Sequence, residues 1–213
     1  MGPNERSTEE VLGTRLRAAR ERAALTVRGL ARAVGVSASL ISQIERGRVN
    51  PSVGTLYAIS NELGLLIDDL FRDSERAPRN RATLPSPVQR SLDRKAIRLD
   101  AGVRWERLTA SPDQEAEFLY VVYDPGGASC AEDSLIRHGG KEYAYLLSGR
   151  LGVKIGFEEY ELEPGDSISF DAQSPHRLWA IGSEPAVAIW VVLNRHSDRR
   201  QDGKSPEKTT RGG

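Results

Sequence analysis

The sequence predicts a two-domain fold, in which a small all-α domain is followed by an all-β barrel. The first observation is a set of apolar residues at helical spacing up to about residue 74, in segments that begin near Ser or Thr. The second is a series of short segments of strand-like composition from about residue 93, separated by turns that contain Gly or Pro. A chain of 213 residues is long enough for two domains of ordinary size.

Five helices are predicted in the N-terminal domain, at residues 10–74, after an N-terminal arm of residues 1–9. The first is expected from Glu9 to about Ala24, and the fifth is a short apolar turn at residues 67–71. Hydroxyl side chains suited to N-caps precede the starts of the first four helices, at Thr8, Thr26, Ser37 and Ser52. The side chains expected to face the interior are Leu12, Leu16, Ala19, Ala23, Leu30, Ala31, Val34, Ile41, Ile44, Leu56, Ile59 and Leu63.

The third predicted helix has an outer face of short polar side chains. Gly35 ends the preceding helix, because glycine accepts the left-handed conformation without a Cβ clash. The outer face then carries Ala38, Ser39, Ser42 and Gln43, whereas a structural surface helix usually exposes Glu, Lys and Arg. Short side chains allow close approach to base edges in the major groove of DNA. The pattern therefore predicts a DNA-reading helix, and the alternative is a helical bundle without a DNA-binding role.

The same segment closely resembles the XRE-type, or phage repressor-like, helix-turn-helix domain over roughly residues 10–73. The resemblance rests on Leu30-Ala31, on Val34-Gly-Val-Ser37, on Ser42-Gln-Ile-Glu-Arg-Gly47 and on Asn50-Pro-Ser52. Helix-turn-helix domains of this type usually act in pairs, which implies a homodimer on a palindromic operator with half-sites about one helical turn apart, or a multiple of it.

Individual DNA contacts are predicted from the side chains of this segment. Gln43 is expected to read a base, because its amide can form a bidentate pair with adenine. Ser39 and Ser42 are expected as secondary readers, and Ala38 as a contact for a thymine methyl group. The residues expected to hold backbone phosphates are Thr26, Arg28, Ser37, Arg46, Arg48 and Asn50.

The charge is distributed unevenly, although the formal net charge is zero. Residues 1–56 contain nine Arg and five Glu, and residues 75–98 contain seven basic and two acidic side chains. Residues 99–196 reverse the sign, with sixteen acidic and eight basic side chains. Positive charge is therefore concentrated where phosphates are expected to dock.

The remaining segments are predicted from composition. Residues 75–92 are basic, contain three prolines and are expected to form a semi-extended linker, and residues 197–213 are expected to form a disordered tail. Cys130 is the single cysteine, which excludes an internal disulfide and favours a reducing cytoplasm. No segment has the apolar length of a signal peptide or a membrane span, so we expect a cytoplasmic protein that does not associate with membranes.

Ten short strands are predicted in the C-terminal domain, and their spacing indicates a closed sandwich or barrel. They lie at residues 96–99, 103–109, 118–123, 134–138, 142–147, 151–155, 160–162, 167–170, 176–181 and 186–193. His138-Gly-Gly-Lys-Glu142, followed by Gly149, resembles the first conserved motif of the cupin superfamily. Pro164-Gly-Asp166 with Pro175-His176 resembles the second. The resemblance implies a cupin jelly-roll barrel, or double-stranded β-helix, at residues 93–196, and the two domains in this order resemble the bacterial XRE-cupin regulator family.

The cupin resemblance also implies a metal centre. His138, Glu142 and His176 match three ligand positions of the motifs, whereas the first histidine position holds Ile136, which cannot coordinate. Two imidazoles and one carboxylate form the facial triad typical of Fe(II), and three ligands also suffice for zinc or nickel. The second motif departs from the common pattern at Asp171, Gln173 and Ala180. Two alternatives therefore stay open: one divalent metal ion, or an organic effector in a metal-free pocket.

Side-chain alternation along the strands predicts the walls of this pocket. If His138, Glu142 and His176 point inward, Ile136, Ala144 and Leu178 do so as well, and these six residues are the predicted effector site. Tyr143 and Tyr145 would then face outward and are predicted as dimer contacts.

Two classes of function fit these observations. The first is a transcriptional regulator whose cupin domain senses a metal or small metabolite. The second is a mononuclear iron enzyme, because the hydroxypropylphosphonate epoxidases also join a helix-turn-helix-like domain to a cupin with two His and one Glu. That family places a substrate-binding lysine in its helical domain, at a position that aligns with Ala24 of this chain. The DNA-facing helix and the missing lysine favour the regulator.

Overall fold

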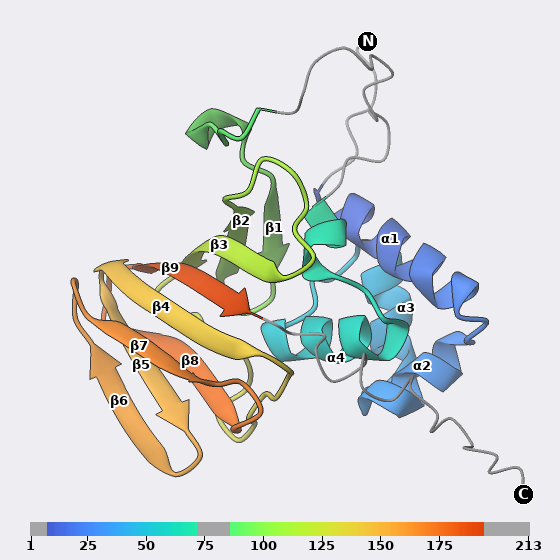
Figure 1. The fold of residues 1–213 in the computed structure, drawn as a ribbon. Helices are drawn as coiled ribbons and strands as arrows, with labels where there is room; N and C mark the ends of the chain where they lie inside the picture. The colour runs from blue at the N-terminus through green and yellow to red at the C-terminus, as the bar shows by residue number, and fades with distance from the viewer. Residues whose placement is uncertain (1–7, 72–85, 194–213) are drawn as a thin grey trace, which may run out of the picture.

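The computed structural model describes residues 8–71 and 86–193, and in these ranges the helices lie at one end of the molecule and two β-sheets at the other (Figure 1). The helical elements are α1 (Thr8–Arg22), α2 (Val27–Val34), α3 (Ala38–Glu45), α4 (Val53–Leu63) and two 3₁₀ turns, η1 (Ile67–Phe71) and η2 (Ser91–Asp93). The strands are β1 (Ala96–Leu99), β2 (Val103–Arg107), β3 (Ala116–Tyr123), β4 (Lys141–Ser148), β5 (Arg150–Ile155), β6 (Glu158–Leu162), β7 (Ser167–Asp171), β8 (His176–Ile181) and β9 (Ala186–Leu193).

Three of the predicted N-caps form as expected. The side-chain oxygens of Thr26, Ser37 and Ser52 accept hydrogen bonds from backbone N–H groups in the first turns of α2, α3 and α4. Gly35 and Gly64 end α2 and α4 in the left-handed conformation, with φ of 74° and 66°. The local chemistry of these short residues is therefore enough to place the start of α3 and both ends of α4.

The prediction of five α-helices was wrong, because the described residues contain four, and the fifth segment is the 3₁₀ turn η1. In this turn Asp69 N donates a hydrogen bond to the carbonyl of Leu66, three residues earlier, which is the 3₁₀ pattern. The first helix also ends earlier than predicted, since Ala24 adopts a left-handed φ of 54°. Bonds from Ala24 N to Glu21 O and from Leu25 N to Arg20 O close the helix end, which leaves Ala23 exposed rather than buried.

The C-terminal domain is built from two antiparallel sheets. One has six strands in the order β1-β2-β3-β9-β4-β7, and the other has three in the order β6-β5-β8. Nine strands form within the described residues instead of ten, because residues 134–138 make only a single bridge between Ile136 and His176. The next backbone bond, from His138 N to the Ala172 carbonyl, goes to another segment and ends that pairing. Burial alternates along β4 as predicted: Glu142, Ala144 and Leu146 are buried, and Tyr143 and Tyr145 are exposed.

The two domains meet at α4, at η1 and at the segment before α4, and α1 also lies against β1 (Figure 1). Gly54 N donates to the Ser129 carbonyl, Asp100 N donates to the Pro51 carbonyl, and Asp113 N donates to the Asp68 carboxylate at 2.7 Å. The buried apolar side chains of both domains form one continuous core. The helical domain is therefore packed directly against the β-domain.

The predicted arm at residues 1–9, linker at 75–92 and tail at 197–213 lie mostly outside the described residues. Within the described ranges, no helix combines the length and the apolar character that a membrane span requires.

Candidate functional site

Helix α3 presents the predicted DNA-reading face. Ile41 and Ile44 are buried in the helical core, and the opposite side carries Ser39, which is exposed, and Gln43, which is half-buried. The Gln43 amide donates to the Ser39 hydroxyl at 3.2 Å, so these two side chains lie together on the surface. Ala38 and Ser42 are half-buried on the same helix. This face can come close to another molecule, because no long side chain stands on it.

Basic and hydroxyl side chains lie next to α3 in the chain. Arg28 on α2 and Arg46 and Arg48 after α3 are exposed, and Asn50 is half-buried. Thr26 and Ser37 accept the capping bonds of α2 and α3, and a hydroxyl that accepts still has its own hydrogen to donate to a phosphate oxygen. Both lie at helix N-termini, which attract anions.

A buried ion pair fixes the end of α3 against α1. Arg20 Nε and Nη2 donate to the two carboxylate oxygens of Glu45 at 2.6 and 2.8 Å, and Arg20 Nη1 donates to the Leu25 carbonyl at 2.8 Å. The side chains of Arg20 and Glu45 are only 9% and 6% exposed. The hydrogen bond to Glu45 raises the pKa of Arg20 above its usual value. Because Glu45 is the last residue of α3, this pair sets the position of the helix.

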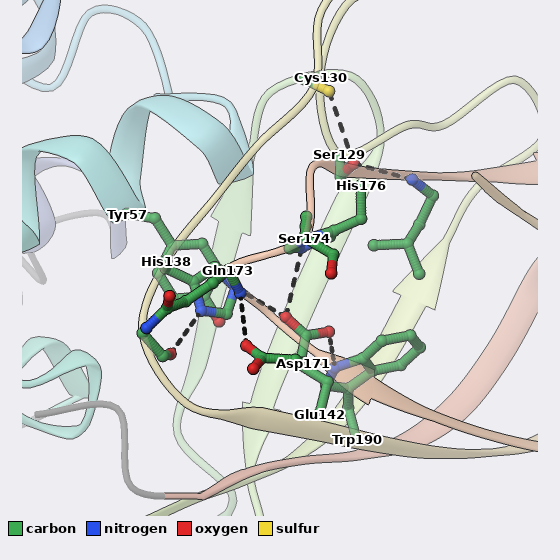
Figure 2. Close-up of polar contacts among 12 residues, drawn as sticks. Tyr57, Ser129, Cys130, His138, Glu142, Asp171, Gln173, Ser174, His176 and Trp190 are labelled. Carbon is green, nitrogen blue, oxygen red and sulfur yellow. Dashed lines mark hydrogen bonds and ion pairs between the residues drawn. The ribbon is translucent and has the colours of Figure 1, made fainter. Parts of the chain in front are cut away.

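His138, Glu142 and His176 converge in the β-domain (Figure 2), and one ligand atom from each lies within 4.8 Å of the others. Glu142 lies on β4, His176 begins β8, and His138 precedes β4. Glu142 Oε1 is 2.7 Å from His138 Nε2 and 3.3 Å from His176 Nε2. Ligand atoms about 2.1 Å from a common metal ion lie about 3–3.5 Å apart, so this spacing suits one ion.

The hydrogen bonds of the two imidazoles aim their lone pairs at the same point. His138 Nδ1 lies 3.0 Å from the Gly139 carbonyl, and His176 Nδ1 lies 2.9 Å from the Ser174 carbonyl. A carbonyl only accepts, so each Nδ1 carries the ring hydrogen and each Nε2 presents a lone pair. Both Nε2 atoms are buried and lack a hydrogen-bond donor. Two lone pairs that face a carboxylate repel it unless a proton or a metal ion lies between them, and a divalent metal fits this arrangement.

Trp190 holds the carboxylate in place. Its indole Nε1 donates to Glu142 Oε2 at 2.8 Å, which leaves Oε1 directed at the two histidines. Burial raises the pKa of the Glu142 carboxyl, but when both histidines carry a proton on Nε2 their hydrogen bonds and positive charges outweigh burial and lower that pKa to about 2, and a metal cation in place of these protons would act in the same direction. Glu142 is therefore an oriented carboxylate at neutral pH, as a metal ligand has to be.

A small cavity of about 20 Å³ adjoins the three ligands. This volume holds one or two water molecules, and a metabolite needs far more space. Of the predicted effector residues, Ile136, Glu142, His176 and Leu178 line this cavity, whereas His138 and Ala144 do not. The other walls are aromatic and aliphatic side chains of β2, β3 and β9.

Two wall residues, Val53 and Tyr57, come from α4 of the helical domain and were not predicted. The Tyr57 ring stacks on the His138 ring with centroids 3.9 Å apart (Figure 2). Its hydroxyl donates to Glu117 at 3.0 Å. The sequence signal is their spacing, because Val53, Tyr57 and Ser60 fall on one face of α4 at i, i+4 and i+7. In the structure these three residues are buried, like Leu56 and Ile59 beside them. A helix buried on two sides has a second packing partner.

Comparison with known proteins identifies both predicted domains. Residues 11–71 match the model of a helix-turn-helix domain, and residues 113–192 match the model of a cupin domain. The HTH-type transcriptional regulator PuuR of Escherichia coli is 22% identical over 185 residues, which cover 87% of this chain and 94% of PuuR. The uncharacterized HTH-type transcriptional regulator YazB of Bacillus subtilis is 36% identical over 61 residues, which cover 29% of this chain and 88% of YazB.

A solved structure has the same two-domain fold. The HTH_3 family transcriptional regulator from Vibrio cholerae superimposes with a TM-score of 0.61 at 22% identity, over 87% of this chain and 96% of that chain. At this identity the likeness concerns the fold. Together with the two domain matches, these findings show that the chain belongs to the family of HTH-type transcriptional regulators that carry a cupin domain.

Proposed function

We propose that this protein binds a palindromic DNA operator as a homodimer and that its cupin domain senses a divalent metal ion, a small effector or both. The observation that carries the DNA-binding part is the face of α3 with short side chains, where Ser39 is exposed and Gln43 half-buried, between exposed arginines. Gln43, Ser39, Ser42 and Ala38 read bases, and the residues that hold phosphates are Thr26, Arg28, Ser37, Arg46, Arg48 and Asn50. Such a regulator works in the cytoplasm, where DNA is accessible.

The sensing part rests on the cluster of His138, Glu142 and His176. When bound, iron, zinc or nickel at these ligands would supply open coordination positions for a small molecule. The proposed effector site consists of this cluster with Ile136 and Leu178, which line the adjoining cavity, whereas Ala144, also expected there, does not line it. A sensor has to bind its ligand and does not have to convert it, so the protein is proposed as a regulator without catalytic activity.

Gln43→Ala is expected to weaken binding to the cognate operator by about 1–3 kcal/mol and to relax base preference, because the bidentate contact is lost. Arg46→Ala is expected to weaken binding to all sequences alike and to reduce the salt dependence, because a phosphate contact is lost. Titration of the chain's own upstream DNA and of a scrambled duplex at several salt concentrations measures both effects.

Gln114→Ala is the matched control, since Gln114 is an exposed amide in the β-domain. It should bind the operator like the wild type. Equal operator affinity of Gln43→Ala and the wild type would show that α3 does not read bases in the proposed orientation.

The proposed dimer uses the outer face of the six-stranded sheet. Tyr143 and Tyr145 are 39% and 49% exposed there and line a surface groove of about 320 Å³ with Ile168, Ile189 and Val191. In the register of the sheet, Tyr143 lies opposite Val191, and Tyr145 lies opposite Ile189. We place a second copy of the same sheet on this face, because a symmetric homodimer buries the same patch of tyrosines and aliphatic residues on both subunits.

Light scattering is expected to give about twice the 23.4 kDa chain mass for the wild type. Tyr145→Glu is expected to shift the protein to monomer, because a carboxylate would be buried without a partner in the interface. Tyr160→Glu on β6 of the other sheet should stay dimeric. A wild type that is monomeric both free and bound to DNA would exclude this mode of assembly.

The second candidate function is an iron enzyme of the hydroxypropylphosphonate epoxidase type. The buried set of two histidines and one glutamate favours it. Against it, Ala24 lies in the turn after α1 and offers no cation for a phosphonate. Turnover of a hydroxypropylphosphonate by the iron-loaded protein, without binding to its upstream DNA, would favour the enzyme over the regulator.

A further inference from the structure

Helix α4 belongs to the helical domain (Figure 1), yet two of its side chains, Val53 and Tyr57, line the cavity beside the three candidate ligands. Figure 2 shows Tyr57 next to His138. Tyr57 covers His138 face to face, with an interplanar angle of 24°, and also packs against Trp105. Its hydroxyl donates to Glu117 on β3, which is itself buried. The site is thus built by residues from both domains.

The first turn of α4 approaches the β-domain at backbone distance. Gly54 N donates to the Ser129 carbonyl at 3.2 Å. A Cβ atom on Gly54 would lie 2.5 Å from the Cγ2 atom of Ile136, the residue at the first histidine position of the cupin motif. Glycine is therefore needed at this position for the close approach, and a shift of Ile136 towards α4 would meet the helix backbone.

The walls of the cavity differ in how firmly they are held. Strands β2, β3, β4, β8 and β9 are paired in ladders, so their cavity-facing side chains have fixed backbones. Helix α4 is joined to the β-domain by few backbone bonds, such as that of Gly54. A cavity of about 20 Å³ accepts a metal ion with water-sized ligands, and any larger chelating molecule has to displace a wall. Helix α4 is therefore the wall with the fewest backbone bonds to the rest of the cavity.

The same helix is close to the DNA-reading segment in the chain. Residues 46–52 connect the end of α3 to the start of α4 and include Arg48 and Asn50, which are proposed to hold phosphates. Pro51 in this connection accepts a hydrogen bond from Asp100 N of the β-domain. A shift of α4 therefore acts directly on the segment that positions the DNA contacts.

We propose that the sensory site is shared between the domains, with Val53 and Tyr57 of α4 as its movable wall, and that occupancy reaches the DNA-binding domain through Tyr57. The occupant is a divalent cation with water-sized ligands, joined by a small chelating molecule when α4 moves outward. This inference rests on the proposed function.

The contact between Tyr57 and His138 is tested by hydrogen exchange on the full-length protein. The measurement uses no DNA, and Zn²⁺ alone is the probe. Zinc at the three ligands holds His138 and the Tyr57 ring stacked on it, so amide exchange in α4 is expected to slow by about fivefold or more. In Tyr57→Leu this slowing should disappear, and in Tyr57→Phe, which keeps the stacked ring, it should persist. Zinc binding that leaves exchange in α4 of the wild type unchanged would overturn the inference.

Gly54→Ala tests the same contact without any metal. The added methyl group pushes α4 away from Ile136, so operator affinity is expected to change by about fivefold or more although residue 54 is outside the proposed DNA contacts. Gly54→Ala/Ile136→Ala removes the clash and is expected to restore wild-type affinity, which also shows that the fold survives. Unchanged affinity in Gly54→Ala would overturn the inference, whereas a wild type that fails to bind its operator would contradict the proposed function instead.

Discussion

Arg20→Met is expected to destabilise the helical domain by about 3–5 kcal/mol, because it leaves the Glu45 carboxylate buried without its partner. Three donors of Arg20 are engaged, two by Glu45 and one by the Leu25 carbonyl. The loss also releases the end of α3 from α1, so operator binding should weaken along with stability. Urea denaturation followed by circular dichroism measures the change in the free energy of unfolding.

Arg17→Met is the matched control on the same helix. Arg17 pairs with Glu21, but the side chains of both are more than half exposed. Solvent screens such a pair, so its removal should leave stability unchanged within error. Arg20→Met/Glu45→Met should recover part of the loss, since no buried charge remains unpaired. Equal stability of Arg20→Met and Arg17→Met would mean that the buried pair does not hold α1 and α3 together.

Glu142→Ala is expected to abolish the stabilisation of the β-domain by zinc. A ligand at one hundred times its dissociation constant stabilises the folded state by about 2.7 kcal/mol. Wild-type protein should therefore unfold at a higher temperature with zinc than after chelation with EDTA, and Glu142→Ala should unfold at the same temperature in both conditions. Trp190→Phe keeps the ligands but loses the bond to Glu142 Oε2, which should lower zinc affinity by about 10–100-fold.

Glu161→Ala controls for the loss of a carboxylate. Glu161 forms an exposed ion pair with Arg150 on the other sheet, away from the three ligands. Its zinc response should equal that of the wild type. If zinc stabilises Glu142→Ala as much as the wild type, the metal lies elsewhere, and if it stabilises neither, the three residues do not hold zinc.

Local sequence determined most of the helical domain. Thr26, Ser37 and Ser52 cap their helices through their own side chains, and Gly35 and Gly64 end helices because glycine tolerates positive φ. The same holds for β4, where alternation alone places Glu142 inward and Tyr143 outward. Such features depend on residues within about four positions along the chain, so the sequence is enough to predict them.

Other elements depend on partners that are distant in the chain. Ala24 takes a left-handed φ without being glycine, and the bond of the neighbouring Leu25 carbonyl to Arg20 helps to hold this turn. Residues 134–138 have strand-like composition but find a backbone partner at one position only, where Ile136 meets His176. Sequence patterns state which residues prefer an extended or helical backbone, and the availability of a partner decides whether they adopt it.

The cluster of His138, Glu142 and His176 likewise combines features set by local sequence with features set by tertiary packing. The sequence by itself determined the three candidate ligands, since His138, Glu142 and His176 stand in recognisable motifs. Only the tertiary structure placed Trp190 on the Glu142 carboxylate and Tyr57 on the His138 ring, across 48 residues for the first pair and from another domain for the second. Contacts of this kind are set by how sheets and helices pack in three dimensions, and no spacing along the chain encodes them.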